Sequence, residues 1–142
     1  MILLDSDHLS VLWYVDSVSG VQLRGRLDGT PSEAVALPVI VLEEQLRGWL
    51  GAIGRAGDLD KQIMAYDKLI RALEFLSRWP NVRFDERSAQ EFRRLRRAKV
   101  RIGTQDLKIA AIALANNALL LTANARDFRK VPGLRFDNWL TP

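Results

Sequence analysis

Acidic and amide side chains follow the apolar runs of this chain at points where buried strands are expected to end. The residues concerned are Asp5, Glu43, Glu44, Asp106, Thr122, Asn124 and Asp127. The carboxyl ends of parallel strands share one edge of a sheet, and open α/β folds bind their ligands at that edge. We therefore expect four separate segments of the chain to bring oxygen atoms to one place.

A cluster of carboxylates needs a counter-charge. Two carboxylates about 4 Å apart repel each other by roughly 4 kcal/mol at an effective dielectric constant near 20. The cluster must therefore bind a cation or hold protons through raised pKa values. No Lys or Arg stands at these strand ends, the chain has no Cys, and His8 is its only histidine. Such oxygen ligands suit Mg²⁺ or Mn²⁺ better than Zn²⁺, and these ions can hold a phosphodiester and activate a water.

Taken one at a time, the same residues also have purely structural explanations. A carboxylate in the first turn of a helix, such as Asp106, stabilises the helix dipole by about 0.3–1 kcal/mol. Asp7 fits better as a helix cap than as a ligand, and His8 fits a helix residue near the rim of the site. Asp5 is harder to explain in this way, because an acid at the end of a buried strand is costly to desolvate.

Short apolar runs alternate with amphipathic segments, a pattern typical of a parallel sheet with helices on both faces and right-handed crossovers. We predict strands at Met1–Leu4, after Pro38 in the run Val35–Leu42, at Val82–Phe84, at Ala118–Thr122 and, on the edge, at Leu134–Trp139. Predicted helices include Leu9–Trp13 after a Ser6 or Asp7 cap, Val21–Leu27, Glu43–Ile53, Leu59–Leu76, a basic helix opened by a Ser88–Glu91 capping box, and an Ala-rich helix capped by Thr104. The segment Asn124–Phe128 is expected to be a loop or a short helical turn.

The composition limits the classes of protein to which the chain can belong. Its 142 residues fit one domain, 1–142, and 48% apolar residues argue against disorder. The absence of cysteine fits a reducing cytoplasm. The chain shows neither a secretion signal nor an apolar run long enough to span a bilayer. A net charge of +4 and a pI near 9.8 favour a polyanionic partner.

Four segments resemble the PIN-domain proteins of the VapC toxin type, in the expected order and at the usual distances. They are "LLDSDHLS", "VLEEQLRG", "DLKIAAIALANNALLLTANARDFRKVPGL" and the closing "DNW". The resemblance implies a three-layer α/β/α sandwich around a small central parallel sheet. It also implies an endoribonuclease that depends on Mg²⁺ or Mn²⁺ and acts as the toxin of a toxin–antitoxin pair. The implied partners are an RNA substrate, a cognate antitoxin and a second copy of the chain.

The resemblance also assigns roles to individual residues. Asp5 matches the first acid of the family, Glu44 the second with Glu43 as a close rival, and Asp106 the third. Asp5 and Asp106 are expected to bind the metal, and Glu44 to position the attacking water or act as base. Asn124 stands where many members carry a fourth acid. The remaining two expected contributors are Thr122, which with Asn124 orients ligands or phosphate, and Asp127, which either supplies the missing charge or caps a turn.

Two other functions compete with this interpretation. The Asp5-x-Asp7 pattern after an apolar strand resembles a haloacid-dehalogenase-like phosphatase, but that class needs a Lys and a further acidic motif well beyond Thr122. The second alternative is a catalytically weakened PIN fold that binds RNA or a partner without cleaving it. The basic run Arg93–Arg101 could contact an RNA backbone, although a solvated helix face is the favoured explanation. No residue selects between tRNA and rRNA.

Overall fold

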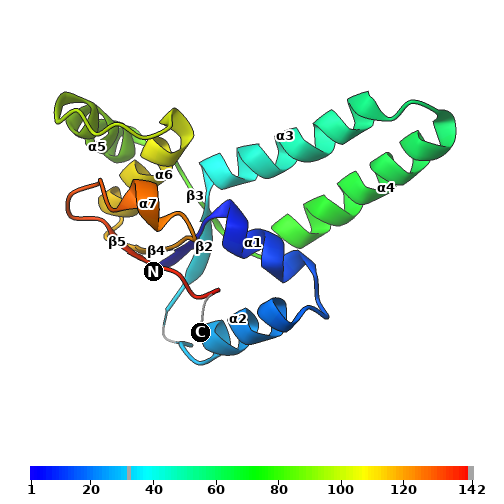
Figure 1. Ribbon diagram of the computed structural model, residues 1–142, viewed down its shortest axis with the longest axis horizontal. Helices are drawn as coiled ribbons and strands as arrows, with labels where there is room; N and C mark the ends of the chain where they lie inside the picture. Colours follow the sequence, from blue (N-terminus) through cyan, green and yellow to red (C-terminus); the bar gives the residue numbers. More distant parts are fainter. Residues whose placement is uncertain (32, 141–142) are drawn as a thin grey trace.

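A five-stranded parallel sheet forms the centre of the protein in the computed structural model, which describes residues 1–31 and 33–140. The strand order is β3-β2-β1-β4-β5, and every neighbouring pair is parallel (Figure 1). The strands are β1 (Ile2–Leu4), β2 (Val35–Pro38), β3 (Asn81–Val82), β4 (Leu119–Leu121) and β5 (Arg135–Asp137). The predicted single domain, 1–142, includes Ser32, Thr141 and Pro142, which lie outside the described residues.

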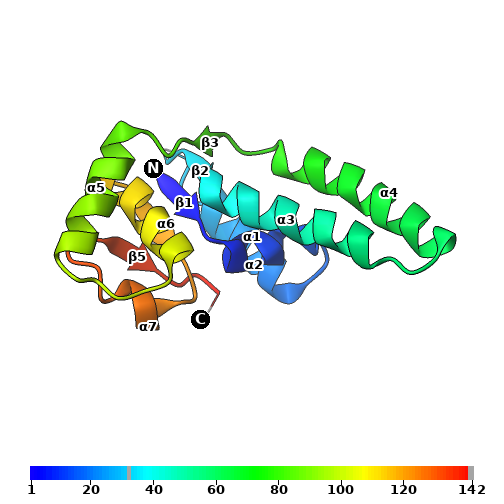
Figure 2. The same cartoon turned by 90° about the horizontal axis from the view of Figure 1, so that it is seen from above.

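Seven helices connect and flank these strands within the described ranges. They are α1 (Ser6–Trp13), α2 (Val18–Asp28), α3 (Val39–Arg55), α4 (Leu59–Leu76), α5 (Glu86–Arg97), α6 (Thr104–Ala115) and α7 (Ala125–Phe128). Helices α1 and α2, α3 and α4, and α5 and α6 pack in pairs around the sheet (Figures 1 and 2). The expected α/β/α arrangement around a small parallel sheet is confirmed.

The core lies along β1, β4 and α6. β1 occupies the middle of the sheet, and its three residues are all buried. Helix α6 is rich in alanine, and its small side chains let the helix approach both α5 and the sheet closely. This packing fixes the ends of β1 and β4 and the first turn of α6, which are three of the four places where polar residues were expected to meet.

Helices α3 and α4 form an arm that extends away from the sheet in both views (Figures 1 and 2). The predicted helix over Leu59–Leu76 is confirmed, but most of its apolar face is not buried. Five of its six predicted face residues are 48–72% exposed, namely Leu59, Ile63, Tyr66, Ile70 and Leu73. None of the helices in the described ranges is long and apolar enough to cross a membrane.

The prediction for the Val35–Leu42 run is wrong. The strand ends at Pro38, and "VIVL" forms the first turn of α3. Proline has no N–H with which to extend the ladder, and β2 pairs with β1 only at Val35 and Ala36. Pro38, with φ −60° and ψ 139°, is instead the N-cap residue of α3. Glu43 and Glu44 therefore lie in the second turn of a helix, not directly after a strand.

Three smaller differences concern the ends of elements. Helix α5 is capped by Asp85, whose carboxylate accepts from the Ser88 N–H at 2.9 Å, so the predicted Ser88–Glu91 capping box is wrong. Thr104 is the first residue of α6 and not its cap, which is Gly103. Strand β3 covers Asn81–Val82 and ends before Phe84. These differences leave the order of elements as predicted.

Candidate active site

Asp5 lies at the junction of β1 and α1, directly after the last residue of the central strand. It is only 7% exposed. One carboxylate oxygen accepts from the Ser6 N–H at 2.8 Å, which makes Asp5 the N-cap of α1. The other oxygen accepts from the Thr122 hydroxyl at 2.7 Å, across the edge between β1 and β4. The Asp5 carboxylate is therefore held in one orientation by two donors.

The charge on Asp5 is destabilised by its surroundings. The pKa of Asp5 is raised to about 6, mainly by burial. The neighbouring Asp7 and Asp106 carboxylates contribute to this increase, and the hydrogen bonds from Thr122 and Ser6 oppose it. The ionised form of such a carboxylate is unfavourable alone and is stabilised when a cation binds to it.

Asp106 lies in the first turn of α6 and faces the same edge of the sheet. Burial raises the pKa of Asp106, and the Glu44 and Asp127 carboxylates add to this effect. The Asn124 amide donates to Asp106 at 3.2 Å and to Asp127 at 3.1 Å. Asn124 thus forms a neutral bridge between two acids at the position where the resemblance implied a further carboxylate.

The two adjacent glutamates on α3 have different surroundings. Glu44 accepts from the Ser6 hydroxyl at 2.7 Å and lies close enough to raise the pKa of Asp106. Glu43 instead pairs with Arg47 at 2.6 Å and accepts from Gln105 at 2.8 Å. Glu44, and not Glu43, joins the acidic cluster that contains Asp5 and Asp106.

Asp7 and His8 were wrongly interpreted from the sequence. Asp7 does not cap α1, because Asp5 does; its carboxylate accepts from the Ala123 N–H at 2.9 Å and contacts His8 at 2.6 Å. Burial favours the neutral acid, but the bonds from His8 and Ala123 outweigh it and lower the pKa of Asp7. His8 is fully buried and does not lie at the rim. The signal in the sequence that could have indicated this pair is that His8 directly follows Asp7.

The remaining predicted site residues follow β4. Thr122 is fully buried and bonds to Asp5. Asn124 caps the short helix α7 by accepting from the Asp127 N–H at 3.4 Å. Asp127 lies in the first turn of α7, and its carboxylate is 3.8 Å from the Lys130 ammonium. Asp127 therefore does not cap this turn, because Asn124 does, but its carboxylate lies close enough to Asp106 to raise the pKa of that residue.

The donor chemistry of the cluster fits Mg²⁺ or Mn²⁺. Its candidate ligands are carboxylate, hydroxyl and amide oxygens, and in the described part of the chain no Lys or Arg forms an ion pair with Asp5, Glu44 or Asp106. Within the same residues, however, no three acidic or histidine side chains already surround a common point at metal-binding distance. Binding an ion would therefore require these side chains to adjust.

Comparison with known proteins agrees with this geometry. Residues 2–134 match the PIN domain family. The chain is 27% identical over 114 residues to ribonuclease VapC1 of Haemophilus influenzae strain R2866, which covers 77% of each protein. It superimposes on the VapBC-1 structure from nontypeable Haemophilus influenzae with a TM-score of 0.74, at 25% identity over 98% of each chain.

A second solved structure gives the same result. The VapBC2 structure from Rickettsia felis, bound to a DNA fragment from the promoter, superimposes with a TM-score of 0.72 at 26% identity. The match covers 98% of this chain and 99% of the other. The chain therefore belongs to the PIN domain family, and its similarities place it with the VapC-type members.

Proposed function

We propose that this protein is a divalent-metal-dependent endoribonuclease that acts as the toxin of a toxin–antitoxin pair and hydrolyses RNA phosphodiester bonds. The observation that carries the proposal is the meeting of Asp5, Glu44 and Asp106 from three separate elements without a basic partner. Mutual repulsion between these carboxylates does not stabilise the fold. A phosphodiesterase that uses Mg²⁺ or Mn²⁺, however, needs such a group of carboxylates to bind the ion. The names of the VapC relatives point to the same activity.

The residues divide the work according to their contacts. Asp5 and Asp106 would hold the ion, and Thr122 keeps the Asp5 carboxylate turned toward the cluster. Glu44, fixed by the Ser6 hydroxyl, would orient the attacking water and take its proton. Asn124 offers an amide that can donate to a phosphate oxygen or to Asp106. The metal, when bound, would supply a Lewis acid that stabilises the charge on the phosphate.

The experiment compares two glutamates that are adjacent in sequence. Purified protein with Mn²⁺ should cleave RNA, and EDTA should stop the cleavage. Glu44→Gln should lower the cleavage rate by about 10²-fold or more because it removes the proposed base, while Glu43→Gln should stay near the wild-type rate. A wild-type protein that shifts RNA on a gel without cutting it would instead support the catalytically weakened binding module.

The phosphatase alternative is not favoured. In that class the first aspartate attacks phosphorus as a nucleophile, and a Lys with a further acidic motif is needed well beyond Thr122, where only twenty residues remain. The fold and its relatives are also those of PIN domains. A phosphoaspartate trapped at Asp5 would revive the alternative.

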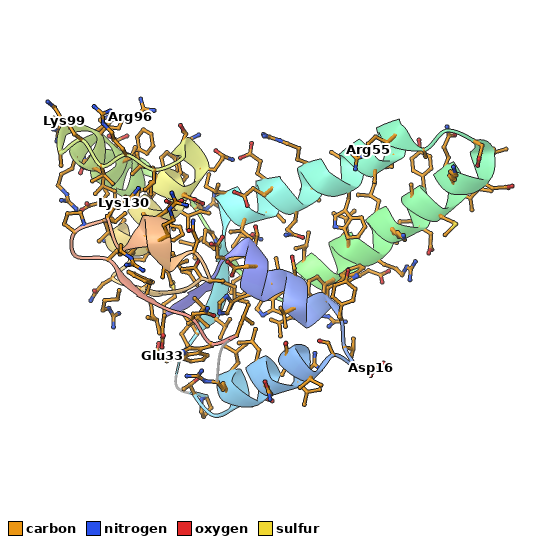
Figure 3. All side chains as sticks on the ribbon, viewed as in Figure 1. Asp16, Glu33, Arg55, Arg96, Lys99 and Lys130 are labelled. Atoms are coloured by element: carbon orange, nitrogen blue, oxygen red, sulfur yellow. The ribbon has the colours of Figure 1, made fainter. Side chains whose placement is uncertain are left out.

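The RNA substrate is proposed to be a tRNA or an rRNA in the cytoplasm. Basic side chains available for its backbone lie on α5 and directly after it, and Figure 3 shows Arg96 and Lys99 extending outward there. Incubation with total tRNA and with ribosomes, in separate arms, distinguishes the two classes. Charge reversal at Lys99 should reduce the salt dependence of RNA binding if this surface holds phosphates.

We also propose an antitoxin partner, and the exposed stripe on α4 is the surface proposed for it. Its residues, Leu59, Ile63, Tyr66, Ile70 and Leu73, are spaced alternately by four and three, as in the seam of a coiled coil. Solved neighbours of this chain are VapBC toxin–antitoxin complexes. An amphipathic helix of the antitoxin is the occupant that fits this spacing.

Charge argues against a second copy of α4 as the occupant. Asp60, Asp67 and Glu74 form a row along one flank of the stripe, and a two-fold antiparallel pairing would place this row opposite its own copy. Like charges in such flanking positions disfavour a pair. The antitoxin helix should therefore carry basic residues at the matching positions. The homodimer implied by the family stays a prediction, measured by light scattering of the purified chain.

A further inference from the structure

We propose that His8 is a positioning residue that holds Asp7 as an additional carboxylate of the active site. The inference rests on the proposed function and adds a residue pair that the resemblance did not assign. Asp7 and His8 belong to the first turn of α1, the helix that Asp5 caps.

Both ring nitrogens of His8 are used, and their partners assign a single tautomer. The backbone N–H of Trp139 lies 3.1 Å from Nε2. A backbone amide can only donate, so Nε2 accepts, and the proton resides on Nδ1, which donates to the Asp7 carboxylate at 2.6 Å. The ring is fully buried. It cannot turn over without losing both bonds in a site closed to water.

Asp7 is oriented from both of its oxygens. One accepts from His8, and the other accepts from the Ala123 N–H at 2.9 Å. The second oxygen also lies 3.4 Å from the Thr122 hydroxyl, which donates to Asp5 at 2.7 Å. Two donors, the His8 ring and the Ala123 N–H, therefore converge on a carboxylate that the helix does not need as a cap. They place it beside Asp5 at the shared ends of β1 and β4.

The position of Asp7 compensates for a residue that is missing elsewhere in the cluster. Asn124 provides no negative charge at the end of β4, and the nearby Asp127 carboxylate lies 3.8 Å from the Lys130 ammonium. The Asp7 carboxylate lies 3.4 Å from the Thr122 hydroxyl that donates to Asp5. An additional carboxylate thus reaches the site from α1 instead of from the segment after β4.

His8 is itself anchored by the segment that follows β5. Trp139 donates its backbone N–H to His8 and its indole N–H to Asp137 at 3.0 Å. The Arg26 guanidinium, from α2, stacks 4.4 Å from the centre of the Trp139 ring. The chain ahead of Thr141 is therefore connected through one imidazole to an acid of the active site.

Two amide substitutions separate the two bonds of His8. In His8→Asn, the side-chain amide occupies the place of Nδ1 and can still donate to Asp7, but nothing accepts from Trp139. In His8→Gln, the amide reaches the place of Nε2 and can accept from Trp139, but the donor to Asp7 is lost. Both variants remove the ring, so the loss of packing is matched.

The measurement is Mn²⁺ binding by isothermal titration calorimetry on the full chain, with unfolding followed by circular dichroism. Supporting groups of metal ligands typically contribute 10–100-fold to affinity. We therefore expect His8→Gln and Asp7→Asn to lose about tenfold or more in Mn²⁺ affinity, and His8→Asn to stay within about threefold of wild type. The cleavage rate at limiting Mn²⁺ should follow the same order.

The possible outcomes separate this inference from the proposed function. If the wild-type chain binds Mn²⁺ and cleaves RNA, but His8→Gln and Asp7→Asn bind as tightly as wild type, only the role of the pair is overturned. A purely structural His8 would give the reverse order, with His8→Asn weaker than His8→Gln. A wild-type chain without Mn²⁺ affinity overturns both. Should the His8 variants fail to fold, Asp7→Asn alone decides, because it leaves the ring in place.

Discussion

The acidic edge of the sheet and the α4 stripe depart from ordinary packing in opposite ways. At the edge, Asp5 is charged yet buried, and the pKa of this residue is raised to about 6 by burial and by its acidic neighbours. On α4, apolar side chains such as Leu59 and Ile63 are exposed along the arm. Neither region is what the isolated fold needs for stability. The proposed function explains each region by something that binds to it, a cation at the edge and an apolar helix on the arm.

The largest expected effect belongs to the edge. Asp5→Asn should lower RNA cleavage by about 10³-fold, because it removes a proposed metal ligand. The metal-free protein should become more stable by about 1 kcal/mol, since a neutral amide relieves the cost of a buried charge. The new side-chain NH₂ group can donate to the Thr122 oxygen, because the Thr122 hydroxyl hydrogen can turn toward Asp7 instead.

Cleavage assays and urea unfolding of the metal-free variant check these two expectations together. Loss of activity accompanied by marked unfolding would show that Asp5 is a structural residue, and the contrast between the two regions would then disappear. Asp67→Asn, on the exposed flank of α4, serves as the control for removing one carboxylate elsewhere.

The next effect tests the arm. Ile63→Glu should weaken binding of the proposed antitoxin by about 10²-fold, because it places a charge within an apolar seam. The stability of the isolated protein should change by less than about 0.5 kcal/mol, since Ile63 is 61% exposed. Cleavage by the free toxin should be unaffected.

Lys68→Glu introduces the same side chain on the opposite side of α4, two residues from Tyr66 and therefore about 200° around the helix. It should bind the antitoxin as wild type does in a calorimetric titration. If both substitutions weaken binding equally, net charge and not the stripe determines the interaction.

The sequence predicts a part of each region and leaves another part undetermined. Helical periodicity predicted α4 and the composition of its face, but periodicity shows only that a face is apolar, not what covers it. Likewise, the alternation of runs predicted the meeting of Asp5 and Asp106, because both positions follow from the direction of parallel strands. The β2–α3 boundary was wrong because a four-residue apolar run fits a strand or a helix turn equally well.

Side-chain direction was the part of the site that sequence could not provide. Glu43 and Glu44 are adjacent, and only the packing of α3 determines that Glu44 faces Ser6 while Glu43 faces Arg47. His8 was placed at the rim because a single histidine carries no pattern. Its burial depends on Trp139, which is 131 residues away in the chain.

A pH titration sharpens the difference at the edge. Asp5 has a pKa of about 6 in the folded chain against an ordinary value of 3.8, so between about pH 4 and pH 6 the native state binds a proton that the unfolded state has released. Stability of the metal-free protein should therefore fall as pH rises through this window, by on the order of 2 kcal/mol. Asp106, whose pKa is also raised, acts in the same direction. The lowered pKa of Asp7 has the opposite effect on stability, but below about pH 4.

Urea unfolding at several pH values, with EDTA and with Mn²⁺, measures this slope. Saturating Mn²⁺ should remove or reverse the decrease, because the bound ion stabilises the ionised carboxylates. Asp5→Asn should flatten the slope without metal. An unchanged slope in that variant would assign the pH dependence to other groups, and a stripe variant such as Ile63→Glu should leave it as in wild type.

The smallest effect concerns Asn124, where this chain departs from many PIN domains. Asn124→Asp keeps a side chain that can cap α7, but it replaces the amide that donates to Asp106 and Asp127 with a like charge. The metal-free protein should lose about 1 kcal/mol of stability, and Mn²⁺ affinity should rise by about threefold, because the added carboxylate is repelled only while the cation is absent. Calorimetry and unfolding on the same preparation check both signs. A variant that loses stability equally with and without Mn²⁺ would show that Asn124 matters only for the turn, and that the charge of this edge is already complete with Asp7.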